Sequence, residues 1–436
     1  MTWWRRWRPP FMLKLLLALV LLGLIGIGAV WWLNVRDEAP LGQADASRTS
    51  PELIAQGAYL ARAGNCAGCH TVRGGAPYAG GRGMATPFGT VFAPNLTPDP
   101  TSGLGQWTSA EFWRAMHNGR SRGGRLLYPV FPYPNYTQIT RADSDALWAY
   151  LRSLPASTQA NRPHALRFPF DQQASLAVWR ALYFRPGQRA AEARRSAEWQ
   201  RGAYLVEGLG HCNACHSSRN ALGASTGTLD LGGGLIPVQN WYAPSLTSAS
   251  EASVADWSAG EIAALLKAGV SSHGGLQAAV QGPMAEVVSN STQYLSDADL
   301  AAMAVFLKTL PQQATPLPPK AATATDAALQ RGAQLYGDHC AACHGSQGEG
   351  APGAYPALAG NRAVTLNPPA NLVHIVLEGG FAPATAGNPR PYGMPPFGPV
   401  LNNDELADLL SFIRSSWGNR AAAVSSFEVN RYREGQ

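Results

Sequence analysis

Three short cysteine motifs constrain this chain more than any other feature of its sequence. All six cysteines fall in the pattern Cys-x-x-Cys-His, which occurs as Cys66-Ala-Gly-Cys69-His70, Cys212-Asn-Ala-Cys215-His216 and Cys340-Ala-Ala-Cys343-His344. The pattern is the attachment signature of c-type haem, in which two thiols bond the porphyrin and the histidine binds the iron. The motifs therefore predict three covalently bound haems c, with His70, His216 and His344 as the proximal iron ligands.

Two other uses of paired cysteines fit the sequence less well. A structural zinc site needs four ligands, usually from two pairs, and three pairs that are each followed by histidine do not divide in that way. A thioredoxin-like pair needs no histidine at that place and sits in a βαβ pattern, which the sequence lacks. Since the motifs use every cysteine, none remains for a structural disulfide.

The sequence around each motif also repeats. A short helix with Gly-Ala (Gly57, Gly202 and Gly332) precedes each motif, and a glycine-rich loop with Pro-x-Leu follows it. Helices ending in glycine are predicted at 111–119, 261–269 and 371–379, and amphipathic helices at 142–154, 296–310 and 403–417. The chain is therefore predicted to be mostly α-helical, with three tandem units: repeat 1 (residues 53–155), repeat 2 (196–311) and repeat 3 (326–418).

The other segments connect or extend these units. Residues 156–195 are a linker with an aromatic helical segment at 174–184, which either packs on a haem unit or contacts a membrane or partner subunit. Residues 312–325 are a Pro/Ala/Thr linker without core-forming residues, and residues 419–436 are a C-terminal tail.

The N-terminus carries an apolar run at residues 11–33, interrupted only by Lys14. As a helix it would be about 34 Å long, enough to cross a bilayer core. Arginines precede it (Arg5, Arg6 and Arg8) and acidic residues follow it (Asp37 and Glu38). The positive-inside rule then places the N-terminus in the cytoplasm and the three repeats on the periplasmic side.

Residues 1–36 are accordingly predicted to be a single-pass anchor in the cytoplasmic (inner) membrane. A cleaved signal peptide is the alternative, but the run is long for one and ends in Trp31-Trp32-Leu33 without a small-x-small cleavage site. The formal charge of +6 comes partly from this segment, and the other arginines are scattered. We read it as a solvated basic surface, and no nucleic-acid partner is predicted.

The sixth iron ligand differs among the repeats. Met284 in Gly282-Pro283-Met284 and Met394 in Met394-Pro395-Pro396-Phe397 occupy the expected ligand loops of repeats 2 and 3. The corresponding loop of repeat 1 runs from Tyr128 to Tyr133 and has no methionine. Met116, aligned with apolar Leu266 and Val376, is the favoured substitute, and His117 is the alternative. The single histidines elsewhere (His164, His273 and His374) are predicted to be exposed.

The repeats resemble the class I cytochrome c fold. In that fold the proline of Pro-x-Leu accepts a hydrogen bond from the proximal histidine, which assigns this role to Pro94, Pro244 and Pro356. Longer strings, among them GAYLARAGNCAGCHT and LVEGLGHCNACH, resemble the three-haem cytochrome subunit of bacterial membrane-bound dehydrogenases. The match departs at Phe131, where the alcohol-dehydrogenase type has methionine, and at the N-terminal anchor.

The resemblance implies an electron-transfer subunit without catalytic residues of its own. A periplasmic dehydrogenase of quinoprotein, flavin or molybdenum type, oxidising an alcohol, aldehyde or N-heterocycle, would reduce the haems. Electrons would then leave to ubiquinone or a terminal oxidase. Two alternatives stay open: a self-contained haem enzyme, peroxidase-like or acting on sulfur compounds at haem 1, and a cytochrome subunit of a terminal oxidase.

Overall fold

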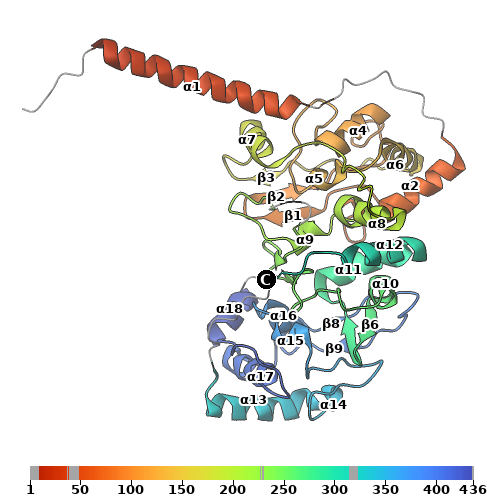
Figure 1. Cartoon of the computed structure of the whole chain (residues 1–436), viewed down its shortest axis with the longest axis vertical. Coiled ribbons are helices and arrows are strands. Elements are labelled where there is room, and N and C mark those ends of the chain that lie inside the picture. The colour runs from red at the N-terminus through yellow and green to blue at the C-terminus, as the bar shows by residue number, and fades with distance from the viewer. Residues whose placement is uncertain are drawn as a thin grey trace, which may run out of the picture.

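The computed structural model describes residues 9–36, 38, 49–225, 227, 230–313 and 323–434. The N-terminal arginines and most of the predicted Pro/Ala/Thr linker lie outside these residues. Helix α1 (Pro9–Val35) projects from the rest of the molecule (Figure 1). Its segment Phe11–Val35 contains an 18-residue window without buried residues and has a mean hydropathy of 2.6, so it is long and apolar enough to span a membrane.

Three crossed helix pairs form the frame of the repeats. The pairs are α2 (Pro51–Ala63) with α6 (Arg141–Ser153), α8 (Ala197–Ala203) with α12 (Asp297–Leu307), and α13 (Asp326–His339) with α17 (Asn403–Ser415). A Cβ added at the repeated glycine would lie 1.9 Å (Gly57), 2.0 Å (Gly202) or 2.3 Å (Gly332) from a carbonyl oxygen of the facing helix. The helices therefore cross where only glycine fits, which accounts for the recurring Gly-Ala.

A third helix in each repeat has clear start and stop signals. These helices are α4 (Ser109–Asn118), α10 (Ala259–Ala268) and α16 (Ala370–Glu378). Capping boxes start the first two, because Thr108 and Ser258 each exchange hydrogen bonds with a glutamate three residues later. All three end at a glycine with positive φ (Gly119, Gly269 and Gly379), as the sequence predicts.

The remaining helices are mostly short. They are α3 (Cys66–His70), α5 (Tyr133–Tyr136), α7 (Gln173–Tyr183), α9 (Asn213–His216), η2 (Thr292–Tyr294), α11 (Gly282–Asn290), α14 (Ala341–His344), α15 (Arg362–Thr365) and α18 (Ser426–Glu434). Helix α18 lies in the predicted C-terminal tail. It packs on α16 and α17 and buries Val429 and Tyr432, so this segment extends the core of repeat 3.

Repeat 2 contains a π-helix, η1 (Tyr204–Leu209), directly after α8. Gly202 stands one residue farther from Cys212 than Gly57 stands from Cys66. A π-helical turn absorbs an inserted residue without changing the two ends of the helix. The second motif therefore keeps its place behind the crossed helix pair.

Short antiparallel strands occupy the loops, where the sequence predicts none. Strands β1 (Gly83–Thr86), β2 (Gly89–Phe92) and β3 (Ala165–Leu166) form one sheet, with Met84 opposite Val91 and Gly89 opposite Leu166. Three two-stranded ribbons are β4 (Gly234–Leu235) with β5 (Tyr242–Ala243), β6 (Val270–His273) with β7 (Leu276–Ala279), and β8 (Gly380–Phe381) with β9 (Gly393–Met394). The fold is still mostly helical, as predicted.

The hydrophobic core is divided unequally. One cluster joins buried residues of repeats 1 and 2, including Leu60, Leu147, Leu205 and Leu300. A separate cluster fills repeat 3 and includes Leu406. Repeats 1 and 2 therefore share one core, whereas repeat 3 has its own.

A reciprocal pair of hydrogen bonds joins repeats 1 and 2. The Tyr59 hydroxyl of α2 donates to Asp299 Oδ2 of α12 at 2.6 Å, and the Tyr204 hydroxyl of η1 donates to Asp143 Oδ2 of α6 at 2.5 Å. Both tyrosines follow their Gly-Ala, and both aspartates occupy the third position of their helix. Repeat 3 has Gln334 in place of the tyrosine.

Candidate haem-binding sites

Each motif lies on a one-turn helix, α3, α9 or α14, with its histidine oriented by a proline carbonyl. The Nδ1–H groups of His70, His216 and His344 donate to the carbonyl oxygens of Pro94, Pro244 and Pro356 at 2.8, 2.8 and 2.9 Å. Because a carbonyl can only accept, this contact puts the ring proton on Nδ1 and leaves the Nε2 lone pair for a metal. Burial lowers the pKa of His70 and His216, so these rings stay neutral near pH 7.

A glycine at the same place in each loop brings the proline to the histidine. The backbone N–H of Gly80, Gly233 and Gly350 donates to the carbonyl of the motif histidine at 2.8, 2.9 and 2.7 Å. All three glycines have φ between 70° and 79°, and a Cβ there would lie within 2.6 Å of the Pro-x-Leu backbone. Each loop therefore needs glycine at this position so that the proline carbonyl can reach the histidine ring.

The six motif thiols differ in exposure. Cys69 and Cys343 are exposed, Cys66, Cys212 and Cys215 are half-buried, and Cys340 is buried. Burial raises the pKa of Cys66 and of Cys212 to about 12, so these thiols stay protonated near pH 7. Paired thiols next to a histidine whose Nε2 is left for a metal fit the attachment of a haem c. Among the described residues no group of three or more His, Cys, Asp or Glu could hold a metal ion, so they offer no tetrahedral zinc site.

The first two motifs are in contact through α5. The buried Asn135 side chain donates to the Glu207 carbonyl and, at 2.7 Å, to Asn213 Oδ1 inside the second motif. The neighbouring Tyr136 hydroxyl donates to the Gly64 carbonyl beside the first motif at 3.3 Å. His211 Nε2 lies 3.3 Å from the same Gly64 carbonyl. Helix α5, which follows the loop of repeat 1 without a methionine, therefore contacts both haem-attachment segments.

Helix α11 of repeat 2, which carries Met284, contacts the segment of the first motif. Arg82 bonds the Gly68 carbonyl inside the first motif and pairs with Glu286 of α11 at 2.6 Å. Ser291, at the end of α11, donates to the Ala63 carbonyl at 3.1 Å. The Arg82–Glu286 pair is about four-tenths exposed, so its own contribution to stability is small. Helix α11 of repeat 2 thus contacts the first motif, as α5 of repeat 1 contacts the second.

The predicted methionine ligands occupy two different settings. Met284 is in the first turn of α11, half-buried against the shared core. Met394 ends strand β9 and packs on the core of repeat 3. A Cβ on Gly379 would lie 2.4 Å from the Met394 carbonyl, so the glycine that ends α16 also allows the methionine strand to approach.

Met116 and His117 differ in what already surrounds them. Met116 is 5 % exposed and belongs to the core cluster that contains Tyr136. The His117 ring stacks on Trp113, with centroids 4.5 Å apart, and its Nδ1 lies 3.5 Å from Thr137 Oγ1. The His117 ring thus has partners on α4 and at Thr137, and Met116 as the sixth ligand of haem 1 stays a prediction.

We expect Met116→Leu to change the low-temperature EPR signal of one haem, because leucine keeps the volume but has no sulfur lone pair. His117→Gln serves as the matched control and should leave all the haem signals unchanged. A changed signal in His117→Gln alone would assign the ligand to the histidine instead.

Sequence reasoning missed several residues at these sites. Asn135, Tyr136 and His211 join the two motifs, and Arg82 joins the first motif to α11. Only His211, next to Cys212, stood close to a recognised pattern. The prediction that His374 is exposed was wrong, since it is 3 % exposed. Trp241 of repeat 2 stacks on it at 5.0 Å and Tyr432 of α18 covers it, and both are distant in sequence.

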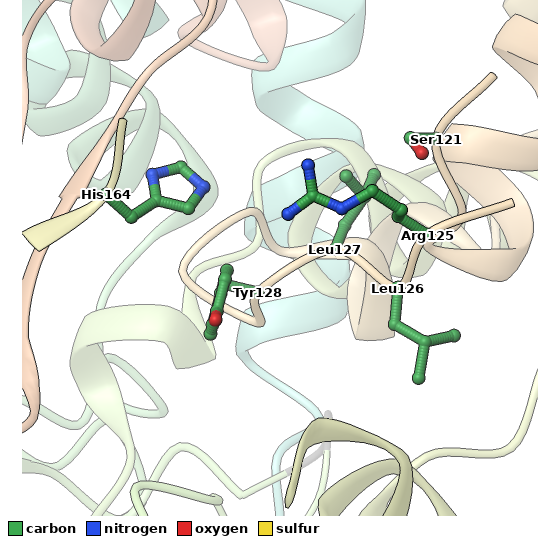
Figure 2. Close-up of a pocket in the computed structure, with 6 residues that line it drawn as sticks. All are labelled: Ser121, Arg125, Leu126, Leu127, Tyr128 and His164. Carbon is green, nitrogen blue, oxygen red and sulfur yellow. The ribbon is translucent and has the colours of Figure 1, made fainter. Parts of the chain in front are cut away.

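A small cavity lies apart from the motifs (Figure 2). Its lining is Ser121, Arg125, Leu126, Leu127, Tyr128 and His164. Figure 2 shows the Arg125 guanidinium pointing toward His164. Burial and the Arg125 charge lower the pKa of His164, which keeps the ring neutral. The lining has no thiol or thioether, so this cavity is not a haem site.

The fold and these sites define a cytochrome of the c type, and the profile of the family "Cytochrome c" matches residues 54–155 and 329–417. Three relatives cover most of the chain. The cytochrome c subunit of the quinone alcohol dehydrogenase of Gluconacetobacter polyoxogenes is 37% identical over 88% of this chain and 84% of its own length. The gluconate 2-dehydrogenase cytochrome c subunit of Pantoea cypripedii is 38% identical over 85% and 87%. One subunit of the nicotinate dehydrogenase of Pseudomonas putida is 40% identical over 94% of this chain but only 34% of that protein.

The chain belongs to the family of cytochrome c subunits of bacterial dehydrogenases. This membership confirms the predicted resemblance and the prediction of an electron-transfer subunit rather than a catalytic one. A solved thiosulfate dehydrogenase from Marichromatium purpuratum aligns with 16% identity and a TM-score of 0.18, too low to support any argument.

Proposed function

We propose that this chain is a membrane-anchored cytochrome with three haems c that passes electrons from a partner dehydrogenase to ubiquinone or a terminal oxidase. The observation that carries the proposal is the threefold recurrence of one geometry: paired thiols, a histidine with a free Nε2, and a proline carbonyl on its Nδ1. Relatives that serve alcohol, gluconate, fructose and nicotinate dehydrogenases support a partner that oxidises an alcohol, a sugar derivative, an aldehyde or an N-heterocycle.

Residues of this chain would hold each haem in a fixed, closed setting. Cys66, Cys69, Cys212, Cys215, Cys340 and Cys343 supply the thioether bonds, and His70, His216 and His344 supply one iron ligand each. Met284, Met394 and Met116 would each give the iron a thioether ligand, and such a ligand favours reduced iron. The bound iron contributes reversible one-electron exchange. Pro94, Pro244 and Pro356 keep the histidine rings from turning.

The contacts between repeats support a route along the chain. The first two motifs touch through Asn135, Tyr136 and His211, which favours direct electron exchange between haems 1 and 2. Repeat 3 joins repeat 2 through Asn371, whose side chain bonds the backbone N–H and carbonyl of Tyr242 at 2.8 and 2.7 Å. No substrate-oxidising group is needed on this chain for such a relay.

The outer end of α1 supports a retained anchor rather than a cleaved signal. The Asn34 side chain donates to the Ala177 carbonyl at 2.9 Å and accepts from Nε of Arg180, which is 3 % exposed. Glu38 pairs with Arg120 at 2.8 Å. Removal of α1 would take these acceptors from two shielded guanidinium groups, which is costly. We propose that the helix stays attached, with the haem units on the periplasmic side.

The proposal is tested on the full chain, tagged and purified from detergent-solubilised native membranes. We expect a dehydrogenase subunit to co-purify, the pyridine haemochrome assay to give three haems per chain, and the substrate of that subunit to reduce all the haems. A copper-containing oxidase as companion would replace the proposal by the oxidase alternative. A peroxide-induced spectral change at one haem, without any companion, would replace it by a self-contained haem enzyme.

A further inference from the structure

Helix α7, in the linker between repeats 1 and 2, buries one face and exposes apolar side chains on the opposite face. Leu176, Arg180 and Phe184 recur every four residues and are 5, 3 and 6 % exposed, so this face packs on repeat 1. Val178 and Leu182 recur at the same interval on the opposite face and are 48 and 63 % exposed. A helix that only covers a soluble domain places polar residues on its outer face. The outer face of α7 therefore needs another explanation.

Neighbouring residues enlarge this face to a patch. We define the α7 patch as Phe168, Val178, Leu182, Tyr183 and Leu222, which are 81, 48, 63, 39 and 43 % exposed. Trp179 contacts two members of the α7 patch. Its Nε1–H donates to the Leu222 carbonyl at 2.9 Å, and the centroid of its ring lies 5.5 Å from that of the Tyr183 ring. Several large apolar side chains exposed on and near one helix point to a membrane or protein contact.

The position of the α7 patch points to the membrane. Helix α7 packs directly against α1 (Figure 1). The contact is at the outer end of α1, where Asn34 bonds Ala177 and Arg180. The same end carries Trp31 and Trp32, which are 66 and 57 % exposed, and tryptophan is enriched at the level of the lipid headgroups.

We propose that α7 lies in the outer headgroup region of the bilayer, with the α7 patch in contact with the acyl chains. This inference rests on the proposed anchor role of α1. Exposed Arg167 and Arg185 flank the helix and would meet anionic headgroups. With α1 and α7 both engaged, the membrane holds repeat 1 at two places and fixes its orientation, which a single flexible anchor would not do.

The test uses the full-length, haem-loaded chain in vesicles of phosphatidylethanolamine and phosphatidylglycerol without other proteins. A nitroxide is attached at Leu182→Cys, at Phe381→Cys as the matched control on β8 with 66 % exposure, and at Leu21→Cys inside α1. The EPR accessibility of each label to oxygen, relative to a water-soluble nickel complex, reports its depth. We expect this ratio to be severalfold higher at position 182 than at 381, and highest at 21.

The outcomes separate the inference from its premise. A deep label at position 21 with equal ratios at 182 and 381 would overturn the α7 proposal and leave the anchor standing. A label at 21 that remains accessible to nickel would overturn the anchor itself. If the label at position 182 becomes inaccessible to the nickel complex only after the partner dehydrogenase is added, the α7 patch contacts protein and the lipid assignment is overturned.

Discussion

Replacing Cys340 and Cys343 together by serine is expected to lower the haem content from three to two per chain while repeats 1 and 2 keep their fold. The thiols are the attachment points in the proposed site, and without them haem leaves an exported protein. Repeat 3 has its own hydrophobic cluster, so we expect the loss of its haem to disturb the packing of that cluster alone. The pyridine haemochrome assay, normalised to protein, measures the content.

Ala342→Ser is the matched control, because it changes an exposed residue between the same two cysteines and should keep all the haem. The corresponding replacement of Cys66 and Cys69 should do more damage. Repeats 1 and 2 share one core, and the first motif contacts α5 and α11, so haem 2 is expected to become labile as well. Full haem content in the Cys340/Cys343 double variant would contradict the proposed attachment.

Gly332→Ala and Gly337→Ala, on the same helix α13, are expected to change stability in opposite directions. A Cβ at position 332 would lie 2.3 Å from the Asp408 carbonyl oxygen and 2.7 Å from Phe412 Cβ. Backbone atoms cannot move aside as side chains do, so we expect a loss near the upper end of the overpacking range, about 3 kcal/mol. At Gly337 nothing lies within 4 Å, and alanine should stabilise the helix by about 1 kcal/mol.

Urea unfolding of the two variants, followed by intrinsic fluorescence, measures this difference in the free energy of unfolding. Because both positions share one helix and one repeat, a general effect of alanine on α13 would appear equally in both. Equal midpoints for the two variants would show that α13 and α17 do not cross as closely as described.

The parts of the fold that the sequence predicts correctly depend on local signals. A cysteine motif, a capping box or a glycine at a helix end acts within one turn, and the corresponding helices are found close to their predicted bounds. The π-helix depends on one inserted residue before Cys212, which becomes meaningful only beside the other repeats. The strands depend on pairing between segments that have little β-propensity of their own, such as Gly89 with Leu166.

The contacts at the candidate sites also differ in whether they lie within one repeat or between two. The His–Pro contacts lie within one repeat, and the resemblance to the cytochrome c fold implies them. The contacts of Asn135 and Tyr136 depend on how two repeats pack, which periodicity does not encode. The same limit applies to α7, where the sequence does not tell which of its faces the rest of the protein covers.

The exchanged tyrosine–aspartate bonds between repeats 1 and 2 make their joint surface self-complementary, as in a homodimer with a two-fold axis. Gln334 stands where repeats 1 and 2 have the tyrosine, so repeat 3 lacks the phenol donor for such an exchange. The pair of repeats 1 and 2, rather than the triplet, is therefore the symmetric element of this chain.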